Sequence, residues 1–403
     1  MDFVGKLFQF HNCRILRNSS IIKEDLWIRD GMIINPEPVF YDEKIVADIK
    51  VDCKDSLIVP GFIDLQINGG FGYDFSNPEK DVSSSIDAVS KNLLQHGVTS
   101  FCPTVITSSP DQYHKIIPKI KTQKGGRHGA GILGVHVEGP FINIDKKGAH
   151  PVQHIRHLDN GIEDVIKTYG TLDNIRIITL APELDPDNIV IKELVQRGVT
   201  VSLGHSACHL SESEKAANNG ASFITHLFNA MLPFHHRDPG LVGLLASHKI
   251  LPPKKVFYGL IADGIHTHPA ALRIAFRTDP KGLVLVTDAI SAMGLKPGTY
   301  NLGDQAVTVT EDRAVVAGTD TLSGSIATMD FCIKFLLSAT GCTLVEALEC
   351  ATLHPSQVLG ITSKKGTLDF DTEADFVLLD EQLNVQTTYI AGEKVWGKDF
   401  LTK

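Results

Sequence analysis

The sequence contains no long hydrophobic run. No stretch of about 18 consecutive apolar residues occurs in it, and a helix needs roughly that length to cross a bilayer. The first residues also lack a basic segment followed by a long apolar one, so no secretory signal peptide is expected. We therefore expect no membrane partner for this protein.

Cysteine pairs at the spacing of metal-binding or redox motifs are absent as well. The seven cysteines are scattered along the chain, and none forms a CxxC pair. An odd number at irregular spacing is typical of free thiols in a reducing compartment. The sequence thus predicts a cytoplasmic protein, with the nucleus as a second compartment of the same kind.

Positive charge is not in excess. The 403 residues include 38 lysines and arginines against 47 aspartates and glutamates, which gives a formal net charge of -9. Proteins that mainly bind nucleic acid need a basic surface, so nucleic acid is not expected as a partner, although a local anion site is compatible with this balance. The length suits one large domain with a small satellite domain.

The middle of the chain alternates apolar runs with segments of helical periodicity. In the first helical segment, Val82, Ile86 and Val89 fall on one face. Such alternation predicts an α/β protein, a (β/α)8 TIM barrel whose parallel strands are buried and read as nearly continuous apolar runs. Eight runs fit the strands: 57–64, 98–104, 132–138, 175–183, 199–205, 221–226, 256–263 and 283–288.

The two flanks of the chain have hairpin signals instead. Residues 26–34 place Asp30-Gly31 between two apolar segments, which is a turn signal. Residues 376–379 and 389–396 read as strands followed by a similar turn. Neither flank forms a stable sheet alone, so we expect both to build one small β-sandwich domain. The predicted domains are 1–56 (small β domain, first part), 57–361 (barrel) and 362–403 (small β domain, second part).

A polar or ionisable residue ends nearly every predicted barrel strand. In TIM barrels the active site lies at the C-terminal ends of the strands. Polar residues also simply mark where strands meet loops, and for any single residue that explanation is equally good. Eight in series favour a functional site: Asp64, Thr104, Glu138, Glu183, His205, His226, Asp263 and Asp288.

Three of these strand ends carry good metal ligands, Glu138, His205 and His226. One carboxylate and two imidazoles leave an open position on a four-coordinate ion, as in catalytic zinc sites. A lone histidine is more often structural, but the recurrence at strand ends favours a metal site. His136 lies two residues before Glu138, and strand alternation would point both side chains into the barrel.

Asp288 is a candidate proton acceptor at the same mouth. A metal brings the pKa of water close to 7, so a carboxylate is a sufficient base for it. The alternative is that Asp288 caps the N-terminus of the next helix.

Eight short segments occur in a characteristic order. They are 60–64 (PGFID), 136–141 (HVEGPF), 148–151 (GAHP), 204–206 (GHS), 225–231 (THLFNAM), 261–266 (IADGIH), 286–289 (VTDA) and 322–325 (LSGS). In this order they resemble the N-acetylglucosamine-6-phosphate deacetylases, a family of the amidohydrolase superfamily. The resemblance covers essentially the whole chain, and residues 229–240 are similar to the animal form of the family.

The resemblance implies a role for each site residue. Glu138, His205 and His226 would hold one divalent metal ion per subunit, and Asp288 would shuttle the proton. His150 would be catalytic through a hydrogen bond to the scissile carbonyl. Arg237 matches an arginine that the family extends across a homodimer interface to the substrate phosphate. Contacts with the phosphorylated amino sugar are implied for Ala149, His150, Asn229, Ala230, Arg237, Asp263, Gly264, His266, Leu322, Ser323 and Gly324.

One departure from the superfamily affects the expected metal count. Many amidohydrolases carry His-x-His at the end of the first barrel strand and bind two metals. This chain has Gln66 and Asn68 there, and amides are poor ligands for a borderline-soft cation. A second metal site is therefore not expected.

Two other histidine pairs are weaker candidates for a metal site. His266 and His268 have metal-like spacing but follow the seventh predicted strand, and by resemblance His266 contacts substrate. His235 and His236 are expected in a loop that lines the sugar-phosphate site.

By resemblance, the expected reaction hydrolyses N-acetyl-D-glucosamine 6-phosphate to D-glucosamine 6-phosphate and acetate, a step of amino-sugar catabolism. The alternatives are an amidohydrolase acting on another N-acyl sugar or a cyclic amide, and a catalytically silent scaffold of the same fold. Loss of metal ligands would mark the scaffold. Two histidines and a glutamate suit Zn2+ best, but iron, cobalt and manganese also bind such sites.

Overall fold

The computed structural model describes residues 5–77 and 81–397. Within them, parallel strands follow one another around a barrel in chain order, and each pairs with the next. A parallel bridge between Ile67 and Ala289 joins the last strand region to the first. The predicted TIM barrel is therefore confirmed. Its strands are β8 (Phe62–Ile67), β11 (Val98–Ile106), β13 (Val135–Glu138), β14 (Ile175–Leu180), β15 (Thr200–Leu203), β16 (Phe223–Ile224), β17 (Phe257–Leu260) and β18 (Leu283–Leu285).

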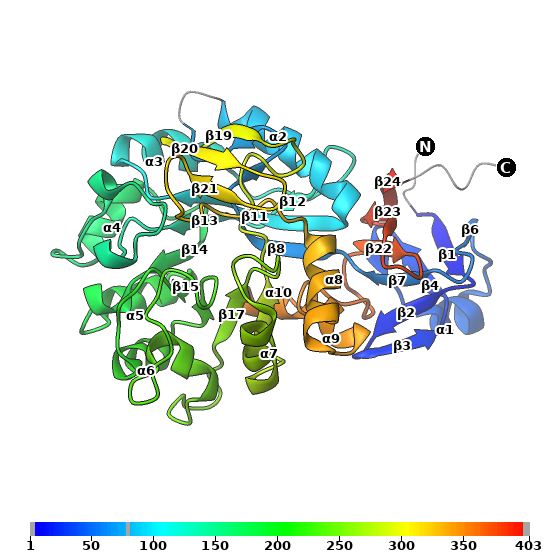
Figure 1. Ribbon diagram of the computed structural model, residues 1–403. Coiled ribbons are helices and arrows are strands. Elements are labelled where there is room, and N and C mark those ends of the chain that lie inside the picture. Colours follow the sequence, from blue (N-terminus) through cyan, green and yellow to red (C-terminus); the bar gives the residue numbers. More distant parts are fainter. Residues whose placement is uncertain (1–4, 78–80, 398–403) are drawn as a thin grey trace.

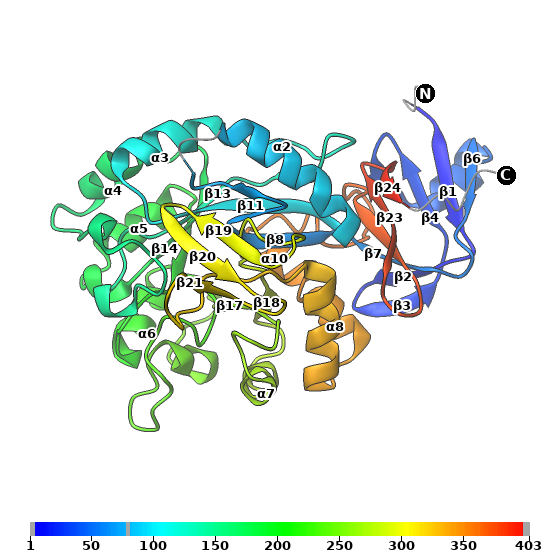
Figure 2. The same ribbon diagram turned by 45° about the horizontal axis from the view of Figure 1, so that its top comes forward.

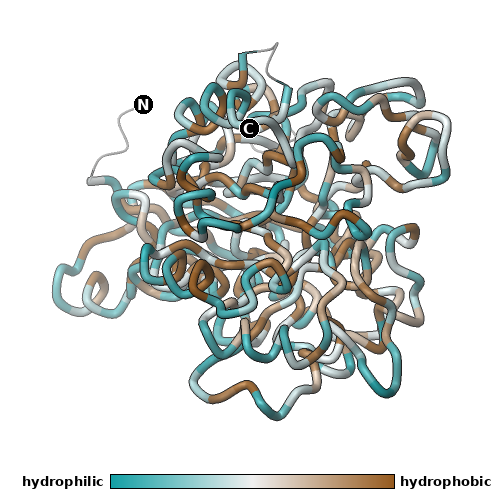
Figure 3. Tube along the Cα trace, turned by 90° about the vertical axis from the view of Figure 1, so that its left-hand side faces the viewer, coloured by the Kyte–Doolittle hydropathy of each residue, from teal (hydrophilic) through white to brown (hydrophobic). Residues whose placement is uncertain are grey.

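Helices surround the barrel on its outside (Figure 1). The first of them buries Val82, Ile86, Val89 and Leu93 against the strands, as its periodicity predicted. Figure 3 shows hydrophobic stretches (brown) toward the middle of the molecule and hydrophilic ones (teal) at many of the outer turns. No helix in the described ranges combines the length and apolarity that crossing a membrane requires. The helices are α2 (Val82–Leu93), α3 (Pro110–Ile116), α4 (Ile162–Tyr169), α5 (Ile189–Gln196), α6 (Leu210–Asn218), α7 (Pro269–Thr278), α8 (Met329–Thr340), α9 (Leu344–Glu349) and α10 (Leu353–Val358).

The first predicted strand, 57–64, is wrong as a single strand. Strand β7 (Leu57–Pro60) pairs with β2 (Arg14–Arg17) and β22 (Phe376–Leu379), outside the barrel. The barrel strand β8 begins only at Phe62. Both pieces are buried throughout, so hydrophobicity does not separate them. Gly61 lies at the crossing, where a Cβ atom would be 2.1 Å from the Thr99 hydroxyl oxygen.

The two flanks of the chain combine into one small β structure, seen in blue and red beside the barrel (Figure 1). One sheet has the order β5-β4-β1-β6 and the other β24-β23-β22-β7-β2-β3. Phe10, Ile28, Phe376 and Tyr389 come from both sheets and share one core, so this is the predicted sandwich. Its remaining strands are β1 (Leu7–His11), β3 (Ser20–Lys23), β4 (Leu26–Arg29), β5 (Met32–Ile33), β6 (Ile49–Asp52), β23 (Val385–Ile390) and β24 (Glu393–Gly397).

The predicted hairpin turns form in both flanks. Asp30 and Gly31 have φ angles of 51° and 77°, which is the left-handed pair that a tight type I′ turn requires. Ala391 and Gly392 repeat this pattern between β23 and β24, with φ angles of 48° and 74°.

A further small sheet lies between β18 and α8 in the sequence and was not predicted. It consists of β19 (Gly298–Leu302), β20 (Gln305–Val309) and β21 (Ala314–Val316), all antiparallel. It lies near the ends of β11 and β13 in both views, coloured yellow (Figures 1 and 2). Its core includes Val307, Val309 and Ile106, so it is packed on the barrel mouth.

Candidate active site

Three residues that turn into the barrel mouth have left-handed backbone conformations. His205, His226 and Asp288 follow β15, β16 and β18, with φ angles of 48°, 24° and 48°. Residues other than glycine seldom adopt such angles, and strained conformations of this kind are enriched at functional sites. Each strand therefore ends in a sharp turn that aims an ionisable side chain into the mouth.

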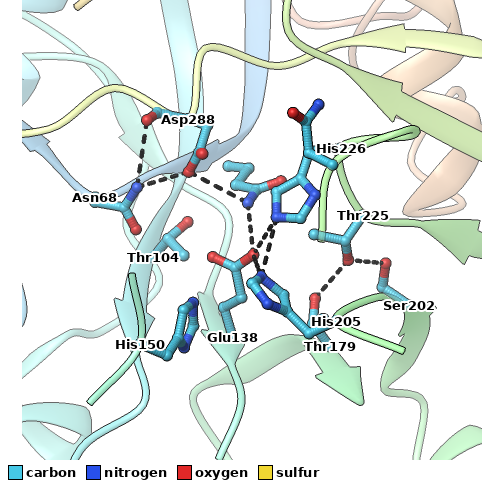
Figure 4. Close-up of polar contacts among 12 residues, drawn as sticks. Asn68, Thr104, Glu138, His150, Thr179, Ser202, His205, Thr225, His226 and Asp288 are labelled. Carbon is cyan, nitrogen blue, oxygen red and sulfur yellow. Dashed lines mark hydrogen bonds and ion pairs between the residues drawn. The ribbon is translucent and has the colours of Figure 1, made fainter. Parts of the chain in front are cut away.

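Glu138, His205 and His226 meet at their polar ends (Figure 4). His205 Nε2 lies 3.2 Å and His226 Nε2 2.9 Å from Glu138 Oε1. The two Nε2 atoms are 3.1 Å apart. Ligand atoms around a tetrahedral zinc ion at bond lengths of 2.0–2.1 Å are about 3.3 Å apart. The spacing of the three atoms thus fits a single small cation.

Each charge in this cluster affects the protonation of its neighbours. Burial favours protonation of Glu138, but hydrogen bonds from His205 and His226 outweigh burial and hold its pKa well below the usual range. Burial opposes a charge on His226, yet the Glu138 carboxylate raises the His226 pKa. A buried carboxylate between two imidazoles requires a compensating positive charge, from protons or from a metal ion.

A second set of ligands is also close together. Ligand atoms of Glu138, His150 and His205 lie within 4.8 Å of one another, so His150 competes with His226 as the third ligand. His150 Nδ1 is 2.7 Å from the Thr107 hydroxyl oxygen, whereas His226 Nε2 points at Glu138. The closer spacing favours the set with His226.

The three imidazoles differ in the surroundings of their ring nitrogens. His205 Nδ1 lies 2.8 Å from the Lys146 carbonyl oxygen, which leaves Nε2 free as a ligand. Burial lowers the pKa of His150 to about 3, so this ring is neutral. His226 Nδ1 is buried, and no described residue forms a hydrogen bond with it.

His136 does not join the cluster. Its two ring nitrogens contact the Leu65 carbonyl oxygen at 2.9 Å and the Thr179 hydroxyl at 2.8 Å. Burial lowers its pKa to about 4. His136 is therefore a neutral part of the barrel interior.

Asp288 lies at the same mouth, and the alternative of a helix cap is wrong. The next helix, α8, begins only at Met329. Asp288 Oδ1 accepts hydrogen bonds from Asn68 Nδ2 at 2.7 Å and Gln66 Nε2 at 3.3 Å. Burial, together with the charge of Glu138, raises the Asp288 pKa to about 6. A carboxylate with this pKa can both accept and return a proton near neutral pH.

A cavity of about 350 Å³ opens over these residues. Glu138, His205, His226 and Asp288 line it, together with most of the residues that the sequence suggested for substrate. The suggested residues in its wall are Ala149, His150, Asn229, Ala230, His266, Leu322 and Gly324.

Four suggested substrate residues are not in the wall of this cavity. Asp263 lies behind His266 and accepts a hydrogen bond from its Nδ1 at 2.6 Å, so it fixes the ring. Gly264 packs against Phe335. Ser323 is fully buried, and its hydroxyl has no partner among the described residues. Arg237 is exposed in the segment between β16 and β17.

The residues of the other two histidine pairs have contacts of their own. His268 is the N-cap of α7, where Nδ1 accepts the Ala270 N–H at 3.1 Å. The rings of His235 and His236 lie 4.5 Å apart on an exposed loop, outside the cavity wall.

Several residues of the wall were not predicted from the sequence. They include Ile106, Ile261, Leu302, Asp320 and Thr321. Leu302 comes from the unpredicted sheet, for which the Gly303-Asp304 turn between two alternating segments was the available signal. Thr107, which contacts His150, had no signal in the sequence.

The cavity wall is acidic. Glu138, Asp288 and Asp320 belong to it, and no lysine or arginine does among the described lining residues. Any cation that meets an anionic substrate must therefore come from a bound metal or from beyond this wall.

The chain is similar to known amidohydrolases. The model of the amidohydrolase family matches residues 57–395. N-acetylglucosamine-6-phosphate deacetylase of Danio rerio is 58% identical over 391 residues, covering 97% of each chain. The Homo sapiens enzyme of that name is 57% identical over 396 residues, covering 98% of this chain and 97% of the relative.

A solved structure is similar over the whole chain. It is a mutant N-acetyl-D-glucosamine-6-phosphate deacetylase of Mycobacterium smegmatis in complex with N-acetyl-D-glucosamine-6-phosphate. The TM-score is 0.81 at 30% identity, covering 97% of this chain and 100% of that chain.

The two possible ligand sets can be separated by substitution. His226→Ala should lose most of the tightly bound metal, because Nε2 directly faces Glu138 and His205. His150→Asn should retain it, because His150 Nδ1 contacts Thr107 and no hydrogen bond in the described ranges joins His150 to Glu138. Elemental analysis of both purified variants measures this. If His150→Asn lost its metal and His226→Ala kept it, the ligands would instead be Glu138, His150 and His205.

Proposed function

The chain belongs to the amidohydrolase family and, within it, to the N-acetylglucosamine-6-phosphate deacetylases, and we propose a mechanism for it from its cavity. The enzyme hydrolyses the linear amide of N-acetyl-D-glucosamine 6-phosphate, giving D-glucosamine 6-phosphate and acetate in amino-sugar catabolism. The observation that carries the mechanism is the meeting of Glu138, His205, His226 and Asp288 in one cavity.

We propose that Glu138, His205 and His226 hold one divalent ion per subunit, with Zn2+ the best fit to one carboxylate and two imidazoles. The spacing of their ligand atoms supports this assignment. When bound there, such an ion would supply Lewis acidity toward the amide carbonyl and toward the attacking water. Gln66 and Asn68 occupy the place of a second pair of ligands, and both donate amide hydrogens to Asp288.

Asp288 moves the proton in this proposal. Its carboxylate accepts a proton from the attacking water and returns it to the leaving nitrogen. One residue can do both, because burial raises the Asp288 pKa to about 6. This pKa lies above that of a free carboxylate and close to the pH of a neutral solution.

In this proposal, His150 donates a hydrogen bond to the carbonyl oxygen of the substrate's acetamide group. The Thr107 N–H points to His150 Nδ1 at 3.4 Å, and the Thr107 hydroxyl lies 2.7 Å from the same atom. These donors make Nδ1 an acceptor, so the proton of the neutral ring lies on Nε2. Nε2–H can then stabilise the negative charge that develops on the substrate oxygen.

The phosphate requires a cation that the cavity wall lacks. We propose a homodimer in which Arg237 reaches the phosphate in the neighbouring subunit. The exposure of Arg237 and the absence of arginine and lysine among the described lining residues support this. A guanidinium fork is suited to phosphate oxygens. Asn229, Ala230, His266 and the loop of Leu322, Ser323 and Gly324 would hold the sugar phosphate within the subunit.

The alternatives are less well supported. A silent scaffold would lack ligands, whereas this cavity retains the carboxylate, both imidazoles and Asp288.

All seven cysteines are free in the described chain, which supports the proposal that the protein works in the cytosol or nucleus.

The Asp288→Asn variant tests the proton shuttle. An amide cannot accept the proton, so turnover of N-acetyl-D-glucosamine 6-phosphate should fall by roughly 10²–10⁴-fold or more. Metal content and substrate binding should persist, because the side chain keeps its size.

Stopped assays for released acetate and elemental analysis measure these effects. N-acetyl-D-glucosamine without the phosphate, and the galactose epimer with it, serve as comparison substrates. If Asp288→Asn turns over near the wild-type rate, Asp288 is not the proton shuttle. If the wild-type enzyme prefers the unphosphorylated sugar, the substrate is not N-acetyl-D-glucosamine 6-phosphate.

The contribution of Arg237 across a dimer can be tested by mixing variants. Arg237→Ala and Asp288→Asn chains should each be impaired with the phosphorylated substrate. In a mixed dimer, one site combines Asp288 of the first chain with Arg237 of the second. Random reassortment of equal parts should restore about one quarter of wild-type activity, because half the dimers are mixed and each has one intact site.

Subunit exchange is verified separately with chains of different mass. No recovery despite exchange would place Arg237 in the site of its own subunit or in none.

A further inference from the structure

Gln66 and Asn68 occupy the end of the first barrel strand and are both fully buried, with exposed fractions of 0% and 1%. Gln66 is in β8, and Asn68 follows it by two residues, so strand alternation places both on one face. As amides they are poor metal ligands. Their hydrogen bonds show what they contribute instead.

Both side chains hold the carboxylate of Asp288. Asn68 Nδ2 lies 2.7 Å from Asp288 Oδ1 and 3.4 Å from the Asp288 carbonyl oxygen (Figure 4). Gln66 Nε2 is 3.3 Å from the same Oδ1 and 3.0 Å from Glu138 Oε1. No hydrogen bond from residues 5–77 or 81–397 reaches Asp288 Oδ2. One oxygen of the carboxylate is thus fixed, and the other is left for the cavity.

The orientation of the Asn68 amide follows from this contact. If the amide were turned over, its oxygen would face Asp288 Oδ1 at about the same distance, and two acceptors would repel. Nδ2 therefore faces Asp288, and Oδ1 faces away. This Oδ1 is buried and without a partner among the described residues, and Asn68 lines the cavity.

Among the described residues, only one end of the Asn68 amide has a hydrogen-bond partner. Buried polar groups that serve the fold usually have hydrogen-bond partners at both ends. Asn68 satisfies only the end that contacts Asp288. Gln66 has the same arrangement, with Nε2 shared by two carboxylates and Oε1 unpaired.

We propose that Asn68 is a positioning residue for the hydrolysis. Its amide holds Asp288 Oδ1 and so keeps Oδ2 directed at the reacting atoms. This inference rests on the role of Asp288 in the proposed function. Gln66 adds a second donor to Oδ1 and ties it to Glu138, so Gln66 acts on the metal ligand as well.

Asn68→Leu removes the amide nitrogen that contacts Asp288 Oδ1 and the Asp288 carbonyl oxygen, with little change in side-chain size. Turnover should fall by roughly 10–100-fold, which is the range for loss of a hydrogen bond to a charged group. KM and metal content should remain close to wild type, because Asn68 does not contact Glu138, His205 or His226. Gln66→Met should lower turnover and weaken metal binding together.

A double-mutant cycle shows whether Asn68 acts through Asp288. In the Asp288→Asn background, Asn68→Leu should have almost no further effect on turnover, because the group it positions is gone. A structural role would give the same fold-loss in both backgrounds. Asn68→Ala is tested in parallel and should behave like Asn68→Leu if the larger side chain fails to fold.

Asn174→Leu is the matched control. Asn174 donates one side-chain hydrogen bond, to the Ile117 carbonyl oxygen at 3.2 Å, and it is not part of the cavity wall. This variant should keep wild-type turnover.

Three results would overturn the inference: turnover of Asn68→Leu within about threefold of wild type, loss of its metal, or an undiminished effect in the Asp288→Asn background. If Asp288→Asn alone keeps wild-type turnover, the proposed shuttle fails too. The two failures are therefore distinguishable.

Discussion

The contact of the Glu138 carboxylate with two imidazole nitrogens is the interaction on which the rest of the site depends. Glu138 is 2% exposed, and an isolated charge at such a position would be strongly destabilised. His205, His226 and the Gln66 amide all point to its Oε1 atom. The surrounding strands hold this arrangement through left-handed turns after β15 and β16, which a relaxed backbone would avoid.

The two carboxylates at the mouth are kept in different states by their surroundings. Glu138 stays ionised because two histidines face it, whereas burial and the charge of Glu138 raise the pKa of Asp288 to about 6. Carboxylates whose pKa values are pushed apart are suited to different tasks. Here one is suited to binding a cation and the other to moving a proton, and the Gln66 amide links them.

Much of this arrangement could be predicted from the sequence, because buried parallel strands and polar strand ends leave a clear pattern. Glu138, His205, His226 and Asp288 were expected at one mouth, and the structure brings them together. The split at Gly61 could not be predicted, since both strands beside it are equally apolar. The Thr107 contact with His150 arises only when distant segments pack. From the sequence, Asn68 was interpreted only as a poor metal ligand in the place of a histidine. Its hydrogen bond to Asp288 forms only when the first and last barrel strands lie side by side.

Activity measured as a function of added metal tests the central claim most directly. Enzyme stripped of metal with a chelator should not release acetate from N-acetyl-D-glucosamine 6-phosphate. Activity should then rise linearly with added Zn2+ and reach its plateau at about one equivalent per chain, because the proposed ligands Glu138, His205 and His226 would form a single site. Full activity of the stripped enzyme, or a plateau only at two equivalents, would contradict the account.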